Sequence, residues 1–337
     1  MKCYLANGTG ITGVTLAERP APTISSDLDV LVEAKAWSLN YRDLMIAKGA
    51  YQPIPANSPP FIPLSDMAGV VLKVGKGVTD LKPGDRVLNA PFRHWPAGRL
   101  RQSWAGTFVG SSGVDGVLAE QVVYPSDSLV KIPPHLNFQE GATFTIAGLT
   151  AWAAVVTHGK TRPGEWVLLH GTGGVSIFAA QLAHLIGAKT IMTTSSKEKA
   201  DFVKSHFGVN ATVNYRDQDW AKQVKELTQG AVDVVVDVVG GDTLSQSLKL
   251  CTFGARVAVI GVLSGQESTI QTRDLLRHQI EIRGTFMEST QELRALMKAV
   301  EASGLKPHID KVFSFDQVQE AYKYTEAQKH IGKVVIG

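Results

Sequence analysis

Residues 171–175 form a glycine-rich loop of the kind that binds phosphate groups. The loop follows a short apolar run, 166–169, and precedes a helical pattern that ends at Gly187. Glycines after a buried strand let the chain turn sharply, and the N–H groups that start the next helix can then bind a pyrophosphate. Ser176 takes the third glycine position of the dinucleotide fingerprint, which predicts slightly looser packing of helix on strand. We predict a dinucleotide site, with an ordinary glycine-rich turn as the alternative. The five residues of the loop that we predict to contact the dinucleotide are Gly171, Thr172, Gly173, Gly174 and Val175.

The end of the next predicted strand, 190–194, indicates which dinucleotide binds. NAD-binding domains place an acidic residue about 20 positions after the first glycine, where it binds the ribose hydroxyls. Residues 191–195 contain no acid. Ser195 and Lys199 instead offer a hydroxyl and a cation that suit a 2′-phosphate, so we expect NADP(H) rather than NAD(H). Ser195 and Ser196 could also cap the following helix, which is compatible with both roles.

The elements that would position this loop are those of a doubly wound α/β domain. The β-branched runs 232–239 and 255–263 are typical of strands buried on both faces of a parallel sheet. Ligands of such sheets bind outside the carboxyl ends of the strands. Gly261, Val262 and Leu263 are therefore predicted cofactor contacts.

Composition excludes several classes of protein. The chain has 337 residues, enough for two domains, and its net charge of +3 is spread evenly, so nothing indicates nucleic-acid binding. Two cysteines, Cys3 and Cys251, can build neither a disulfide framework nor a zinc-thiolate site. The N-terminal residues lack the apolar core of a signal peptide, and no apolar run reaches the roughly 20 residues that span a bilayer. We expect a cytoplasmic protein that acts on a small molecule, without a membrane partner.

The first third of the chain reads as a separate β-rich domain. Residues 28–36 alternate apolar and polar side chains, and 69–75 and 85–88 look like further strands joined by a proline–glycine turn. Six short motifs are spread over nearly the whole chain: Asn40-Tyr-Arg-Asp43, Pro63-Leu-Ser-Asp-Met-Ala-Gly69, Gly84-Asp-Arg-Val87, Ala147-Gly-Leu-Thr-Ala-Trp152, Gly171-Thr-Gly-Gly-Val175 and Gly332-Lys-Val-Val335. In this order they resemble the medium-chain dehydrogenase/reductase superfamily, and within it the zinc-independent, quinone-oxidoreductase-like and enoyl-reductase-like branch.

The resemblance implies an α/β protein made of a Rossmann doubly wound parallel sheet and a GroES-like β-rich catalytic domain. We expect the catalytic domain at 1–126, the dinucleotide-binding domain at 127–287 and a C-terminal return to the catalytic domain at 288–337. A homodimer is the assembly that the family implies.

The resemblance also implies further cofactor contacts. It places Thr150 near the nicotinamide ring, with a tight helix contact as the alternative for this small polar residue. It matches Tyr215 to a residue that lies over the adenosine phosphate in NADPH-dependent relatives. Phe286, at the end of the last predicted strand, 280–286, is a further predicted contact.

Comparison with zinc-dependent members of this superfamily predicts that no metal binds. Those relatives carry a cysteine where this chain has Asn40, a His-Glu pair where it has Ser65 and Asp66, and a third ligand near Ile146. Asparagine, serine and isoleucine cannot make the tetrahedral site of a catalytic zinc. The four-cysteine structural lobe is absent as well, because residues 89–116 contain no cysteine.

Tyr51 is the predicted proton donor, and Asn40 a second hydrogen-bond donor to the substrate. The spacing from Asp43 to Gly49 and Tyr51 matches enoyl-thioester and quinone reductases, in which this tyrosine lies beside the nicotinamide. Asp43 is expected to orient its neighbours. The alternative for Tyr51 is a rim aromatic that covers the cofactor.

Without a metal to polarise a carbonyl, the chemistry that fits is conjugate hydride transfer from NADPH to an activated C=C bond, or to a quinone. The activated bond would belong to an enone or an enoyl ester. The alternatives are a metal-free alcohol/carbonyl dehydrogenase and an NADPH-binding protein with a structural or regulatory role.

One segment has no place in this reading. Residues 91–104 combine three basic and three aromatic side chains in a loop-like stretch. They could bind an anionic partner, or the loop could pack its own aromatics against the domain or a second subunit. We favour the packing interpretation.

Overall fold

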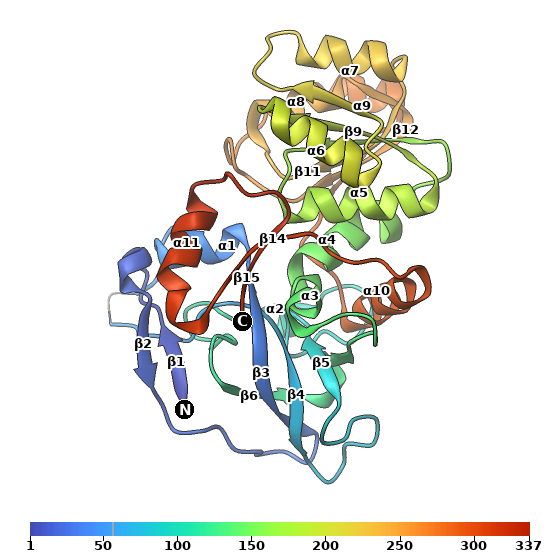
Figure 1. The fold of residues 1–337 in the computed structure, drawn as a ribbon. Coiled ribbons are helices and arrows are strands. Elements are labelled where there is room, and N and C mark those ends of the chain that lie inside the picture. Colours follow the sequence, from blue (N-terminus) through green and yellow to red (C-terminus); the bar gives the residue numbers. More distant parts are fainter. Residues whose placement is uncertain (56) are drawn as a thin grey trace. The chain divides into compact units, whose positions relative to one another are not determined.

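The computed structural model describes residues 1–55 and 57–337 and divides them into two compact units (Figure 1). The first unit contains Met1–Ala147 and Ser289–Gly337, and the second contains Gly148–Glu288. The chain thus leaves the first unit once and returns to it with its C-terminal part, from Ser289 on.

The second unit is built on a parallel sheet of six strands in the order β10-β9-β8-β11-β12-β13. Counted along the chain this order is 3-2-1-4-5-6, the doubly wound arrangement in which the order reverses between β8 and β11. The α/β class is therefore confirmed. The strands are β8 (Trp166–His170), β9 (Lys189–Thr194), β10 (Ala211–Asn214), β11 (Val232–Asp237), β12 (Cys251–Val259) and β13 (Glu281–Gly284).

The central strands of this sheet are buried on both faces. Residues 167–169 of β8 and 234–236 of β11 are Val or Leu and have no exposed surface. Burial of each such side chain stabilises the folded state by roughly 1.5–3 kcal/mol. Because both faces of the strands are buried, these runs do not alternate with polar residues. The helices of the unit are α4 (Leu149–Trp152), α5 (Gly174–Ile186), α6 (Lys197–Phe207), α7 (Trp220–Thr228), α8 (Gly241–Leu248) and α9 (Thr272–His278).

The first unit is β-rich and centred on the long strand β3 (Asp29–Leu39). β3 pairs with β4, with β6 along its first half and with the C-terminal strand β15 along its last residues, where Val334 lies opposite Leu39. Figure 1 shows β15 beside β3 close to the C-terminus. The other strands of this unit are β1 (Lys2–Leu5), β2 (Thr15–Glu18), β4 (Asp66–Val74), β5 (Arg86–Asn89), β6 (Gln121–Pro125), β7 (Leu129–Lys131), β14 (Ile309–Phe313) and β15 (Lys333–Ile336).

Short helices complete the first unit, and they place the polar residues that follow β3. One of them, α1, begins directly after that strand. The helices are α1 (Tyr41–Ala47), α2 (Gln102–Ala105), α3 (Phe138–Ala142), α10 (Thr290–Ser303) and α11 (Val318–Glu326).

The boundary between the units differs from the sequence-based division at residue 126. Residues 127–147 belong to the first unit, because β7 pairs with β5 and α3 packs on β3 and β4. The Thr145 hydroxyl also donates to the Asn89 carbonyl at 2.9 Å. Pairing between strands distant in sequence sets this boundary, and no local pattern reports it.

Helix α4 has a π-helical turn on each side, Phe144–Gly148 and Ala153–Thr157. One predicted strand ends earlier than its sequence pattern. β12 stops at Val259, before the predicted end at 263, because the N–H groups of Ile260 and Gly261 donate to the Asp237 carbonyl and turn the chain out of the sheet.

A substitution at Gly69 on β4 tests how closely β3 and β4 pair. A Cβ at this position would lie 2.2 Å from the Glu33 carbonyl oxygen and 3.0 Å from the Ala34 Cα. Gly69→Ala should lower the free energy of unfolding by about 1–3 kcal/mol, since backbone atoms must shift. Gly106→Ala, where a Cβ meets no described atom within 4 Å, should be neutral or slightly stabilising. Urea unfolding followed by tryptophan fluorescence measures both; equal midpoints would contradict the prediction.

Candidate active site

The glycine-rich loop lies where β8 meets α5, at the switch point of the second unit. Gly171 has φ 71°, a conformation that favours glycine, and no described atom lies within 4 Å of a Cβ built on Gly171 or Gly173. Within the described chain, no side chain caps α5 and its first turn holds no acid. The open backbone and the helix N-terminus fit the pyrophosphate of a dinucleotide.

Ser176, the departure from the dinucleotide fingerprint, has a specific role in this loop. Its side chain is buried, and its hydroxyl donates to the carbonyl oxygen of His170 at 2.7 Å. The hydroxyl therefore fastens the first turn of α5 to the end of β8. The sequence predicted looser packing of helix on strand at this position. The structure shows instead that the serine adds a hydrogen bond between the helix and the strand.

Most of the other predicted cofactor residues follow the carboxyl ends of strands of the same sheet. Ser195 follows β9, and Tyr215 follows the neighbouring strand β10, with its N–H donating to the Thr194 carbonyl at 3.2 Å. Gly261, Val262 and Leu263 follow β12, and Val262 and Leu263 are exposed. Phe286 follows β13 and is about half exposed. The fold thus brings residues distant in sequence to one edge of one sheet.

Thr150 does not follow a strand of the sheet. It is on α4, which packs on α5, and only 3% of its side chain is exposed. This is the geometry of the tight helix contact that the sequence left open as its alternative. A role for Thr150 at the nicotinamide stays a prediction.

The segment after β9 combines a cap with polar groups. The Ser196 hydroxyl accepts from the N–H of Lys199 at 3.4 Å and donates to Glu198 at 2.9 Å, so Ser196 is the cap of α6. Ser195, half-buried, precedes the cap, and Lys199 is in the first turn of α6. The last residue of β9 is Thr194, so no acid stands at the end of that strand.

The loop after β11 is shaped by Asp237, which the sequence did not assign to the site. One carboxylate oxygen accepts from the N–H groups of Val239 and Gly240, both at 2.8 Å. Gly240 has φ 70°, and a Cβ there would lie 2.9 Å from the carbonyl oxygens of Gly261 and Gly265. Asp237 therefore sets the backbone against which the predicted contacts 261–263 pack.

In the first unit, a buried polar cluster surrounds Asn40. The Asn40 amide nitrogen donates to Asp66 at 2.9 Å, and its amide oxygen accepts from the ammonium group of Lys333 at 2.6 Å. Lys333 also donates to the Leu39 carbonyl at 2.5 Å and lies 4.0 Å from Asp66. Asp66 and Lys333 are almost completely buried. Sequence reasoning named Asn40 as a site residue but gave its two partners no role there, although Asp66 and Lys333 both lie in the motifs that resemble the family.

The second half of this cluster lies around Arg42, in the first turn of α1. Its guanidinium lies 5.2 Å from the centre of the Tyr51 ring and 4.0 Å from the centre of the Phe108 ring. It forms an ion pair with Asp43 at 3.1 Å and donates to the Ser65 hydroxyl. Tyr51, the predicted proton donor, thus packs against a cation held in place by buried partners.

Asp43 and the backbone before Ser65 hold this cluster together. Asp43 accepts from the N–H of Asn40 at 2.8 Å, so it orients its neighbours as the sequence predicted. Leu64, which precedes Ser65 and Asp66, has φ 66°, an uncommon conformation for a residue with a side chain. A Cβ on Gly116 would lie 2.1 Å from the Leu64 carbonyl oxygen, so this turn depends on close backbone packing.

Burial controls the charges in the cluster. It raises the pKa of Asp66 to about 7, against the opposing effect of Lys333, and it raises the pKa of Asp43, against that of Arg42. The pKa of Lys333 is lowered by burial, and the carboxylates of Asp66 and Asp43 oppose this shift. The cluster can therefore exchange a proton near neutral pH.

The positions that correspond to zinc ligands hold residues with other partners. Ser65 donates to the Val109 carbonyl at 3.0 Å, Asn40 and Asp66 bond to each other, and Ile146 is buried and apolar. In the part of the chain that the structure describes, no three His, Cys, Asp or Glu side chains gather as metal ligands would.

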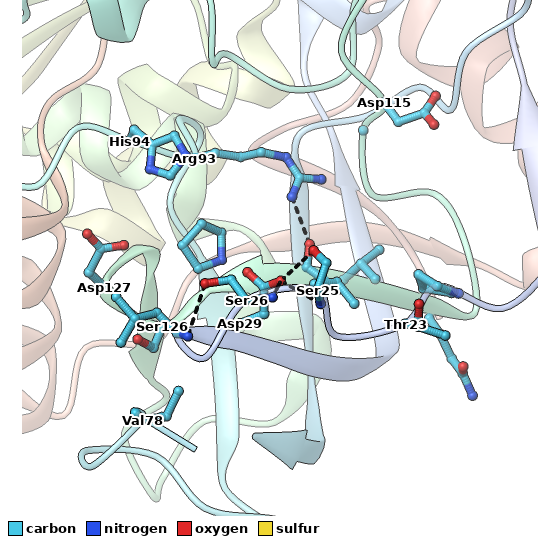
Figure 2. A pocket seen from close by; sticks show the side chains of 18 of the residues that line it. Thr23, Ser25, Ser26, Asp29, Val78, Arg93, His94, Asp115, Ser126 and Asp127 are labelled. Atoms are coloured by element: carbon cyan, nitrogen blue, oxygen red, sulfur yellow. Dashed lines mark hydrogen bonds between the residues drawn. The ribbon is translucent and has the colours of Figure 1, made fainter. Parts of the chain in front are cut away.

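A separate cavity of about 1100 Å³ opens in the first unit and contains none of the predicted site residues (Figure 2). Its Arg93 donates to the Val123 carbonyl at 2.7 Å and lies 4.6 Å from the centre of the Tyr124 ring. Asp29 accepts from the N–H groups of Ser25 and Ser26. These polar groups are occupied in holding the walls, so size alone does not make this cavity the candidate site.

The 91–104 stretch packs its own aromatics, as the favoured interpretation expected. Phe92 and Trp95 are buried, and their ring centres lie 5.3 Å apart in an edge-to-face contact. Phe92 also stacks on Phe108, with ring centres 4.8 Å apart. Phe108 in turn lies under Arg42, so this loop supports the polar cluster.

Comparison with known proteins supports the same class. An alcohol dehydrogenase GroES-like domain model matches residues 26–134, and a zinc-binding dehydrogenase model matches residues 174–302. The chain is 38% identical to a zinc-type alcohol dehydrogenase-like protein of Schizosaccharomyces pombe, over 91% of this chain and 90% of that protein. It is 29% identical to human quinone oxidoreductase, over 90% and 87% of the two chains. It is also 29% identical to a 2-haloacrylate reductase of a Burkholderia species, over 89% and 88%.

These findings place the chain in the medium-chain dehydrogenase/reductase family of oxidoreductases. Its first unit is the GroES-like domain and its second is the Rossmann domain. The family uses NAD(P)H, which fits the glycine-rich loop. Among residues 1–55 and 57–337, no helix is both long and apolar enough to cross a membrane.

The raised pKa of Asp66 predicts how stability depends on pH. The folded state binds the Asp66 proton more tightly than the unfolded state, whose pKa is 3.8. The stability from this proton is fully present below pH ~4 and is lost as pH rises to about 7, by at most about 4 kcal/mol. Asp66→Asn should therefore show a flatter change of unfolding free energy between pH 4 and pH 7.

The control for this prediction is Asp80→Asn, which removes an exposed carboxylate of the same unit. Urea midpoints at one-unit pH steps measure all three proteins. Asp80→Asn should follow the wild type. An Asp66→Asn curve parallel to the wild-type curve would contradict the assignment of the shift to Asp66.

Proposed function

We propose that this chain is an NADPH-dependent, zinc-independent reductase that transfers hydride to an activated C=C bond of an enone or enoyl ester, or to a quinone. The observation that carries the proposal is the polar cluster of Asn40, Arg42 and Asp43, in which the ring of Tyr51 packs against the guanidinium of Arg42. It supplies hydrogen-bond donors and a cation, the groups that conjugate reduction requires.

The assignment of NADPH rests on the end of β9. Ser195 offers a hydroxyl where NAD-specific domains place an acid, and Lys199 and the exposed Tyr215 lie on adjoining elements. A 2′-phosphate adds about two negative charges, for which a hydroxyl and a lysine are better partners than a carboxylate. The open backbone at Gly171 and Gly173 would hold the pyrophosphate.

The proposed reaction divides the work between cofactor and protein. When bound, NADPH supplies a hydride to the β-carbon of the acceptor. Tyr51 then donates a proton to the carbanion or oxyanion that results, so the product gains one hydride and one proton. Asn40 donates a hydrogen bond to the oxygen on which negative charge develops, and the Arg42 cation beside the Tyr51 ring stabilises the tyrosinate left behind.

Zinc independence follows from the residue types at the ligand positions. Asn40, Ser65 and Ile146 replace the ligands of zinc-dependent relatives, and the first two make hydrogen bonds to buried neighbours. Zinc in the names of the matched dehydrogenase model and of the Schizosaccharomyces pombe relative is said of those proteins. The proposal therefore routes no step through a metal.

The expected assembly and location stay predictions. β13 is the edge strand of the six-stranded sheet, so its outer edge is available for pairing with a second copy in the expected homodimer. A cytoplasmic location is an expectation from the sequence.

Ser195→Asp tests the cofactor assignment. A carboxylate here would repel the 2′-phosphate and accept from ribose hydroxyls, so the Kd for NADPH should rise ~10- to 100-fold while that for NADH stays constant or falls. Cofactor fluorescence titration measures both constants. Ser205→Asp, at an exposed position on α6, the helix that follows Ser195, should leave the ratio unchanged. A wild type that prefers NADH would overturn the assignment.

Tyr51→Phe tests the proton donor. It should lower kcat for enone reduction roughly 100-fold, in the range of general acid catalysis, and leave the Kd for NADPH unchanged. Tyr41→Phe, which removes an exposed hydroxyl of the neighbouring helix α1, is the matched control. NADPH oxidation is followed with enones, quinones and aldehydes after treatment with a chelator.

Three outcomes separate the alternatives to this function. Turnover of aldehydes but not of enones or quinones would favour an alcohol/carbonyl dehydrogenase. Tight NADPH binding without turnover of any acceptor would favour a structural or regulatory protein. Activity that the chelator abolishes and zinc restores would contradict zinc independence.

A further inference from the structure

We propose that Lys333, on the C-terminal strand β15, is a positioning residue that orients the side-chain amide of Asn40 for catalysis. The proposal rests on the function inferred above and adds a residue to it. Lys333 belongs to the motif Gly332–Val335, to which neither the predicted chemistry nor the cofactor loop assigned a role.

The sheet does not require a lysine at this position. The residues that follow on β15 are Val334, Val335 and Ile336, all of them buried and apolar. An apolar side chain at 333 could continue this row at lower cost, because burying an ammonium group carries a large desolvation penalty. The ammonium instead finds three oxygen partners within 4.0 Å: the Leu39 carbonyl, Asn40 Oδ1 and Asp66 Oδ2.

The partners of Asn40 fix which way its amide points. The lysine ammonium can only donate hydrogen bonds, and an ionised carboxylate can only accept them. Lys333 therefore selects the amide oxygen, at 2.6 Å, and Asp66 selects the amide nitrogen, at 2.9 Å. A flipped amide would place oxygen against carboxylate and nitrogen against ammonium, so one orientation is strongly preferred.

This orientation makes the second N–H of the Asn40 amide the group that can meet the substrate. The nitrogen carries two hydrogens, and one of them is bound to Asp66. The side chain of Asn40 also interacts with the Asp43 carboxylate. Because Asn40 is only partly buried, a substrate oxygen can accept from this second N–H in place of Asp43. The Lys333 ammonium bound to the amide oxygen also polarises the amide, which makes that N–H a better donor to an oxygen that gains negative charge.

The central variant is Lys333→Met, compared with Lys333→Arg, which keeps a donor and a positive charge. Lys333→Met leaves Asp66 without its counter-charge and can unfold the chain. The double variant Lys333→Met/Asp66→Asn keeps the site neutral and retains an acceptor for the Asn40 nitrogen, so it is measured alongside. Lys131→Met removes an exposed lysine of the same unit and is the control.

We expect Lys333→Met and the double variant to lower kcat for enone reduction about 10- to 100-fold. Lys333→Arg should recover part of that loss, the Kd for NADPH should not change in any variant, and Lys131→Met should behave as the wild type. In an Asn40→Ala background, Lys333→Met should have little further effect on kcat, because its action passes through that amide.

A second measurement does not depend on activity. In a sample labelled with ¹⁵N at asparagine, the Asn40 side-chain signals are identified by their loss in Asn40→Ala. Lys333→Met should shift both N–H resonances and make their exchange with water faster. These shifts would support the positioning role even if the wild type reduced no acceptor. Absence of turnover would contradict only the proposed function.

Three results would overturn the role of Lys333. The first is unchanged Asn40 amide signals in folded Lys333→Met. The second is full additivity of the kcat losses in the double-mutant cycle with Asn40→Ala. The third is a loss of NADPH affinity that accounts for the whole effect on turnover, which would make Lys333 a cofactor ligand.

Discussion

The need to pair buried charges governs the first unit of this protein. Asp66 and Lys333 are both almost fully buried, and a lone charge at either position would be too costly to keep. Their pairing joins β4 to β15, two strands that both pair with β3, and it encloses the amide of Asn40. The polar cluster is therefore part of the structural core and part of the candidate site at once.

A different constraint organises the second unit. The sheet order reverses between β8 and β11, and the backbone there must leave room for a phosphate group. Glycines provide this room at 171 and 173, while the Ser176 hydroxyl and the Asp237 carboxylate hold the adjoining turns by bonds to backbone. The same polar groups that stabilise the fold thus keep the N-terminus of α5 open.

Local sequence patterns were enough to predict the doubly wound fold, because β8 and β11 read as unbroken apolar runs and the glycines stand between a strand and a helix. They also led to Asn40, Asp43 and Tyr51, through the resemblance to a family. They could not reveal Lys333, which lies 293 residues from its partner Asn40 and reaches it only through the register of β15 on β3. The unit boundary after Ala147 depends likewise on long-range strand pairing. Nothing local reports such contacts.

We propose an oxidoreductase in which protein groups supply the proton and the hydrogen bonds and the cofactor supplies the hydride. The most direct test uses NADPH carrying deuterium at the transferable C4 position and an enone acceptor, with chelator-treated enzyme. The account predicts a product with deuterium at the β-carbon and a solvent-derived proton at the α-carbon, formed at the rate of untreated enzyme. An unlabelled β-carbon, deuterium on a carbinol carbon, or activity that returns only with zinc would contradict it.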